Sequence, residues 1–220
     1  MQASEANQER TAPRGSGPAY RIHTSRLVLR CWQPQDAPLL NAAIDASLEH
    51  LRPWMVWAQY EPTDLERKIE HLRRSRGAFD LGEDFPYGIF NRAETQVLGS
   101  TGLHTRAGAR AREIGYWIHQ DHINQGLATE ATAALTKVAF AIDRVTRVEI
   151  HCDPNNVRSR AVPQKLGFCH EATLRQRIRT PDGQPRDTMI WTLLADEYPT
   201  SPAAAAEIEA FDVIGRSLPL

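Results

Sequence analysis

A polar turn at residues 122–131 has the composition of an anion-binding site. It reads His-Ile-Asn-Gln-Gly-Leu-Ala-Thr-Glu-Ala and joins a strand-like run, 113–118, to an alanine-rich helical run, 128–142. The first N–H groups of a helix have no partner inside the helix, and the helix dipole favours negative charge beside them. Gly126 and Ala128 are small enough to let a phosphate approach the backbone. The turn therefore predicts a phosphate site, with an ordinary strand–turn–helix connection as the alternative.

A second polar turn, 153–156, follows another strand-like run and precedes a short helical segment. Asn156 and Ser159 are three residues apart, so both side chains lie on one face of that helix. A ligand could use both groups, but Asn is also a typical helix N-cap and Ser is common within helices. Pro163 lies inside the same segment, where proline costs about 3 kcal/mol unless the helix bends or ends early. The sequence assigns it no function.

Together the two turns resemble the paired motifs of the Gcn5-related, or GNAT, acetyltransferases. GYWIHQDHINQGLATEA (115–131) is similar to the acetyl-CoA turn of the RimJ/RimL branch, and DPNNVRS with KLGF (153–159 and 165–168) to its second half-site. LRPWMVWA (51–58) also resembles that branch, and the likeness extends over roughly residues 22–195. The family pattern Gln/Arg-x-x-Gly-x-Gly/Ala has Ile123 at its first position here.

The resemblance implies how acetyl-CoA would be held. Backbone N–H groups of the first turn would cradle the pyrophosphate, and the preceding strand would splay from its neighbour so that pantetheine fills the gap. The thioester carbonyl would be polarised by an N–H near Trp117 or Ile118, an oxyanion-type contact. Asn156 would bond the CoA arm. The complete cofactor-binding prediction is Trp117, Ile118, His119, Asn124, Gln125, Gly126, Leu127, Ala128, Thr129 and Asn156.

Catalysis requires an acid for the departing thiolate and a neutral amine. The resemblance gives the acid role to Ser159, and Glu113 is the first choice of general base, with His104 and His119 as alternatives. Trp54 and Trp57, together with His104, are expected to form the acceptor pocket, although two tryptophans also cap cores. We expect direct attack by the amine in a ternary complex, with no metal and no covalent enzyme intermediate.

Composition limits the other classes of function. The chain has 220 residues, 41% hydrophobic residues and a net charge of −1, which argues against nucleic-acid binding. Its three cysteines, Cys31, Cys152 and Cys169, have no ligand-like spacing and favour a reducing compartment. Neither a signal peptide nor a membrane span is evident, so we expect a cytoplasmic protein without a membrane partner.

The order of elements predicts a mixed α/β sheet of about seven strands with four helices, with the splayed central strands that the GNAT resemblance implies. Strands are expected at 26–32, 85–91, 96–105, 111–119, 146–152, 168–179 and 186–194, and helices at 34–48, 63–79, 128–142 and 156–166. A Thr63–Glu66 capping box would start the second helix. Residues 1–20 are expected to be a disordered leader, 21–198 the GNAT-like domain, and 199–220 a tail with a short helix within 203–215.

The predicted activity is transfer of acetyl from acetyl-CoA to a primary amine. The acceptor would be the α-amino group of a protein N-terminus, of ribosomal-protein type, or an aminoacyl-like small molecule. An antibiotic, polyamine or other small-amine acetyltransferase is the first alternative, and a non-catalytic CoA-binding sensor is the second. We expect a monomer or a homodimer.

Overall fold

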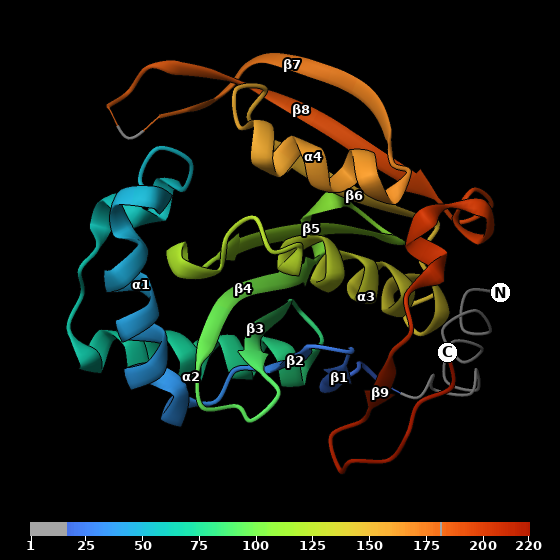
Figure 1. Cartoon of the computed structure of the whole chain (residues 1–220), viewed down its shortest axis with the longest axis horizontal. Coiled ribbons are helices and arrows are strands. Elements are labelled where there is room, and N and C mark those ends of the chain that lie inside the picture. The colour runs from blue at the N-terminus through green and yellow to red at the C-terminus, as the bar shows by residue number, and fades with distance from the viewer. Residues whose placement is uncertain (1–16, 181) are drawn as a thin grey trace, which may run out of the picture.

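The computed structural model describes residues 17–180 and 182–220, so residues 1–16 of the leader predicted at 1–20 lie outside the described residues. A nine-stranded mixed sheet in the order β7-β8-β6-β5-β4-β3-β2-β1-β9 forms the centre (Figure 1). Its strands are β1 (Arg21–His23), β2 (Leu27–Cys31), β3 (Phe85–Asn91), β4 (Val97–His104), β5 (Ala111–Ile118), β6 (Arg147–Cys152), β7 (Cys169–Arg179), β8 (Pro185–Leu194) and β9 (Glu209–Phe211). The α-helices are α1 (Ala37–Leu51), α2 (Leu65–Leu81), α3 (Leu127–Ala141) and α4 (Val157–Leu166).

Capping groups determine where the helices begin and end. The Asp64 side chain accepts the Arg67 N–H at 2.8 Å and caps α2, so the cap is Asp64 rather than the predicted Thr63. Gly82 ends α2 in the left-handed conformation at φ 73°. By contrast, α3 begins after Gly126 with no side-chain cap, which leaves its first N–H groups available.

Helices cover both faces of the sheet. In Figure 1, α3 and α4 lie in front of the strands, while α2 lies behind them and α1 stands at one end of the sheet. Leu135 and Val138 of α3 are fully buried, and Leu72 of α2 is fully buried in the second cluster of core residues. No helix in the described ranges is both long and apolar enough to cross a membrane.

The two central parallel strands separate after three residue pairs. β5 and β6 pair only from Ala111↔Arg147 to Glu113↔Glu149. Beyond that point β5 continues to Ile118 beside β4, while β6 continues to Cys152 beside β8. The predicted splay is confirmed, and it opens a gap in the middle of the sheet beside residues 114–118.

The sheet has nine strands rather than the seven predicted. The two additional strands, β1 and β9, are three residues long and pair with each other at the sheet edge. Such short segments carry no detectable alternation. The expected tail helix at 203–215 is wrong beyond a 3-10 helix at Pro202–Ala205, because the chain then extends to form β9. The leader prediction also fails at its end, since Ala19 is fully buried.

Candidate active site

The first polar turn presents free backbone donors to a cavity. Asn124 and Gly126 both adopt left-handed conformations, at φ 60° and 78°. The Gly126 carbonyl accepts the Glu130 N–H at 3.0 Å, which starts α3, but no side chain caps the helix. Alternating conformations of this kind turn successive N–H groups toward a common point, where an anion is favoured.

The turn is tied to the start of β2 by one arginine. Arg26, just before β2, donates from Nη1 to the Gln125 carbonyl at 2.9 Å and from Nε to the Glu130 carboxylate at 2.6 Å. Thr24 also donates its hydroxyl to Glu130 at 2.5 Å. Burial would raise the pKa of Glu130, but these hydrogen bonds outweigh it and lower the pKa, so the carboxylate stays charged. The turn is therefore held in shape before any ligand binds.

Backbone donors also face the gap between β5 and β6. The His119 N–H donates to the Leu98 carbonyl at 2.8 Å, on the β4 side of β5. The Trp117 carbonyl faces the same way, since a Cβ on Gly99 of β4 would lie 2.2 Å from it. Backbone direction alternates along a strand, so the N–H groups of Tyr116 and Ile118 point into the gap. Of the two predicted thioester donors, Trp117 and Ile118, the Ile118 N–H is the one that points into the gap.

The second half-site joins α4 to β5 across the gap. The Asn156 side chain accepts the Ser159 N–H at 3.1 Å and so caps α4, one of its two expected roles. Pro163 has no N–H, so the Ser159 carbonyl four residues earlier lacks its helix donor. The Tyr116 hydroxyl donates to that carbonyl at 2.9 Å and lies 3.3 Å from the Ser159 hydroxyl. Burial raises the pKa of Tyr116, so the phenol stays neutral and able to donate.

A cavity of about 670 Å³ lies between the two polar turns. Most of the predicted cofactor residues line it, but His119 and Gln125 do not. The His119 ring instead accepts the Asp121 N–H at 3.2 Å, and the Gln125 side chain donates to the Asp121 carbonyl at 3.2 Å. The predicted residues that line this cavity are Trp54, Trp117, Ile118, Asn124, Gly126, Leu127, Ala128, Thr129, Asn156 and Ser159.

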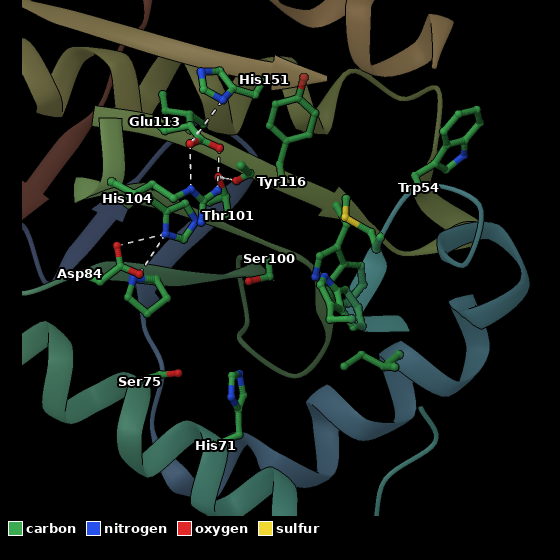
Figure 2. A pocket seen from close by; sticks show the side chains of 18 of the residues that line it. Trp54, His71, Ser75, Asp84, Ser100, Thr101, His104, Glu113, Tyr116 and His151 are labelled. Atoms are coloured by element: carbon green, nitrogen blue, oxygen red, sulfur yellow. Dashed lines mark hydrogen bonds and ion pairs between the residues drawn. The ribbon is translucent and has the colours of Figure 1, made fainter. Parts of the chain in front are cut away.

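A second cavity of about 1240 Å³ continues past Tyr116 and Ser159 to the other side of the gap. Trp54 and Trp57 both line it, and the Trp57 ring lies 6.2 Å from that of Trp117. Figure 2 shows Trp54 on one wall of this cavity, with Ser75 and His71 of α2 below and His104 on the opposite side. The tryptophan loop thus forms a cavity wall, as the sequence suggested.

One side chain from β8 holds the tryptophan loop. Arg186 donates to the Pro53 and Trp54 carbonyls at 3.2 and 3.1 Å, and its Nε lies 3.4 Å from the Asp153 carboxylate at the end of β6. Arg186 and Asp153 side chains are 10% and 8% exposed, so this ion pair is largely shielded from water. The contact fixes the loop relative to the splayed strands.

Glu113 lies deep in the second cavity and is engaged by a cation. Arg106 binds it through two hydrogen bonds of 2.8 and 2.6 Å, and His151 lies 3.6 Å away. Burial would raise the pKa of Glu113, but the Arg106 hydrogen bonds and the charges of His151 and Arg106 outweigh it, so its pKa is lowered. A carboxylate with both oxygens occupied and a low pKa is a weak proton acceptor. This geometry argues against Glu113 as the general base.

Three important residues were not selected from the sequence. Tyr116 was seen only as a strand residue, although the unexplained Pro163 was a signal that the Ser159 carbonyl needed another donor. Arg186 and Asp84 gave no local signal, because their partners lie far away in the chain. Within the described residues, no group of three His, Cys, Asp or Glu side chains is arranged to hold a metal.

Comparison with known proteins identifies the class. The profile of the acetyltransferase (GNAT) domain matches residues 26–169. Bacillus subtilis (strain 168) YdaF, which carries the provisional name of a ribosomal N-acetyltransferase, is 29% identical over 78% of this chain and 93% of its own. The uS5-alanine N-acetyltransferase of Escherichia coli (strain K12) is 25% identical, over 84% of this chain and 96% of its own. Mycobacterium smegmatis RimJ, solved with CoA-disulfide, has a TM-score of 0.69 and 26% identity, over 84% of this chain and 91% of its own.

A mixed sheet split beside an uncapped helix N-terminus, together with this profile match, defines an acyl-CoA-dependent N-acyltransferase. The chain belongs to the GNAT acetyltransferase family, and it is similar to members of that family that carry RimJ/RimL-type names. It is accordingly an acetyl-CoA-dependent N-acetyltransferase.

Proposed function

We propose that the chain acetylates the α-amino group of a protein N-terminus, with acetyl-CoA in the smaller cavity and the acceptor in the larger one. The observation that carries this proposal is that the two cavities meet. The residues that line both are Trp54, Met55, Tyr116, Trp117, Asn156 and Ser159. A thioester in the gap would lie between free β5 donors on one side and the Ser159 hydroxyl on the other. The amine would arrive from the side of the tryptophan loop.

In this proposal the first turn holds the pyrophosphate. The N–H groups of residues 124–129 donate to its oxygens, and Arg158 and Lys165 supply positive charge along the α4 side of the cavity. Pantetheine lies along the open edge of β5, the Ile118 N–H polarises the thioester carbonyl, and the Asn156 amide nitrogen donates to the arm. His119 and Gln125 keep supporting roles in the strand end and the turn.

The chemistry is direct attack of the amine on the thioester carbon. The tetrahedral oxyanion is stabilised by the β5 backbone donor, and the C–S bond then breaks so that sulfur leaves with the bonding pair. Ser159 gives its proton to the thiolate and regains one from solvent. None of the three cysteines is needed as a nucleophile, because the acyl group passes straight from sulfur to nitrogen.

The acceptor cavity favours a peptide over a polycation. Its volume of about 1240 Å³ exceeds the usual ~300–1,000 Å³ of drug-sized sites. Every carboxylate in its wall already has a basic partner, whereas a polyamine needs free carboxylates. These pairs are Glu61 with Lys68, Asp84 with His104, Glu113 with Arg106 and Asp153 with Arg186. The names of the relatives from Escherichia coli and Bacillus subtilis support the same acceptor class. We place the reaction in the cytoplasm, consistent with three unpaired cysteines.

A thiol-release assay tests the proposal. Peptides with a free N-terminus, the same peptides blocked at the N-terminus but carrying lysine, spermidine and an aminoglycoside are each offered with acetyl-CoA, and products are mapped by mass spectrometry. We expect turnover with free N-termini. Turnover confined to spermidine or the aminoglycoside would favour a small-amine enzyme. CoA binding by calorimetry without turnover on any amine would favour the sensor.

A further inference from the structure

The His104 ring at the end of β4 is held by a carboxylate and leaves one nitrogen free. Its Nδ1 lies 3.0 and 2.9 Å from the two Asp84 oxygens, in the loop between α2 and β3. Burial would raise the pKa of Asp84, but hydrogen bonding to His104 and to nearby backbone groups lowers it, so the carboxylate stays charged. Because the carboxylate accepts the Nδ1 proton, the neutral ring carries its lone pair on Nε2. Nε2 has no hydrogen-bond partner among the described residues, and the ring lines the acceptor cavity (Figure 2).

Two glycines make room for this ring. Gly102 of β4 and Gly115 of β5 are cross-strand partners. A Cβ on Gly102 would lie 2.8 Å from the His104 Cε1 and Nε2 atoms, and one on Gly115 would lie 3.5 Å from Nε2. The ring therefore packs directly on the backbone of these two glycines, and its free nitrogen lies over Gly115, one residue before Tyr116. Both His104 and Gly115 line the larger cavity, so this nitrogen lies at its wall.

Two other candidate bases nearby, Glu113 and His151, are occupied. Both oxygens of Glu113 bind Arg106, and the Nε2 of His151 is hydrogen-bonded to Glu149 at 2.8 Å. The charged and titratable groups around His104 are Asp84, Arg106 and Glu113, with His71 of α2 across the cavity. Asp84 orients the His104 ring. Among these groups, His104 has both an oriented ring and a free lone pair.

We propose that His104, positioned by Asp84, is the general base of the acetyl transfer and selects for α-amino acceptors. This inference rests on the proposed function. The His104 Nε2 takes one proton from the α-ammonium group, and the freed nitrogen lone pair forms the N–C bond as the carbonyl π electrons move to oxygen. The C–S bond then breaks, sulfur leaves as thiolate and receives a proton through Ser159. The second nitrogen proton and the His104 proton pass to solvent.

The selection follows from acid strengths. Imidazoles in general have a pKa near 6.5, α-ammonium groups about 7.7–8.0 and lysine ammonium groups about 10.4. The equilibrium constant for proton transfer to an imidazole is therefore below one by roughly one and a half powers of ten when the donor is an α-ammonium group, and by about four powers of ten when it is a lysine ammonium group. We expect kcat/KM for an α-amine to exceed that for a lysine ε-amine by about 100-fold or more at pH 7.

The test measures kcat and KM against pH for wild type, His104→Gln, Asp84→Asn and Glu113→Gln, with an N-terminal peptide and its N-blocked, lysine-bearing counterpart. His104→Gln should lower kcat by about 100-fold and remove the inflection due to the base, with CoA affinity unchanged. Asp84→Asn should lower kcat by about ten-fold and shift that inflection, as expected of a positioning residue. Glu113→Gln should keep the inflection.

Two further variants test the glycine floor and the base chemistry. Gly102→Ala should displace the ring and lower kcat, whereas the matched control Gly77→Ala in α2 meets nothing within 4 Å and should keep full activity. Imidazole added to His104→Ala should restore part of the turnover. As a second control, His170→Gln on the exposed strand β7 should be active.

The outcomes separate the inference from the function it rests on. An active wild type whose His104→Gln variant keeps both kcat and the pH inflection would overturn the inference and leave the acetyltransferase intact. Equal kcat/KM for α- and ε-amines would overturn the selection. A wild type that binds CoA but acetylates no amine would overturn the proposed function itself.

Discussion

Replacing Pro163 should change how much the Tyr116 hydroxyl contributes to stability. In the wild-type chain the Ser159 carbonyl lacks a helix donor, and Tyr116 donates to it at 2.9 Å. Tyr116→Phe therefore leaves this carbonyl with no donor from the protein. An unsatisfied buried group costs about 1–3 kcal/mol, and because Ser159 is only half-buried we expect a loss of about 1.5 kcal/mol in the free energy of unfolding.

In the Pro163→Ala background the same substitution should cost less. The alanine supplies the missing N–H, so the Ser159 carbonyl regains its i+4 donor within α4. Removal of the Tyr116 hydroxyl then costs about 0.5 kcal/mol, the lower end for a replaceable hydrogen bond. The coupling between the two sites should be about 1 kcal/mol, above the roughly 0.3–0.5 kcal/mol within which independent sites add.

Urea unfolding at 25 °C of wild type, both single variants and the double variant gives this coupling from four transition midpoints and their slopes. The cycle is repeated in a Ser159→Ala background, which deletes the hydroxyl 3.3 Å from Tyr116 but keeps the carbonyl. If Tyr116→Phe costs the same with and without Pro163, the reasoning is refuted. If the coupling vanishes when the Ser159 hydroxyl is deleted, the contact runs between the two hydroxyls instead.

Four other predictions follow from the site. Gly126→Glu should weaken CoA binding, measured by calorimetry, by ten-fold or more, since it adds negative charge at a left-handed position (φ 78°), and unchanged affinity would contradict the phosphate turn. Ser159→Ala should lower kcat about ten-fold at constant CoA affinity, and unchanged turnover would leave it an ordinary helix residue. Trp57→Ala should raise the KM for the acceptor and leave kcat unchanged. If circular dichroism shows that this variant is unfolded, the loop belongs to the core instead. Because the pKa of Glu113 is lowered in the folded protein, its pair with Arg106 stabilises the fold fully above the ordinary carboxyl pKa of 4.5, and this stabilisation is lost as the pH falls through the lowered pKa. Glu113→Gln should therefore make the free energy of unfolding depend less on pH in the acid range. The same acid dependence in wild type and variant would count against the pair.

Much of the fold could be predicted because its signals are local. Alternation located seven strands, and the helices were found within three residues at either end. The misses have local causes too. β1 and β9 are too short to alternate, and the alanine-rich tail extends because Ala210 of the edge strand β9 is buried beside β1. At the start of α2, Asp64 rather than Thr63 is close enough to accept the Arg67 N–H.

The candidate site could be predicted only where it is contiguous in sequence. The turn at Gly126 and the segment from Asn156 to Ser159 were recognised because their residues follow one another. The relations between segments were not predictable: Arg186 bonds a loop 132 residues away, and Tyr116 bonds Ser159 43 residues away. The charge state of Glu113 depends on Arg106, a partner that nothing in the sequence indicated.

The interior proline of α4 illustrates how a local defect can serve a distant site. In an isolated helix Pro163 would cost about 3 kcal/mol, because one carbonyl loses its donor and the ring crowds the preceding turn. Here that carbonyl belongs to Ser159, and it faces the gap where β5 and β6 no longer pair. Because β5 and β6 are no longer joined by backbone hydrogen bonds there, a side-chain contact links β5 to α4 across the opening. The orphaned carbonyl accepts the Tyr116 hydroxyl, and the same contact keeps Ser159 beside the strand whose free N–H groups face the thioester position.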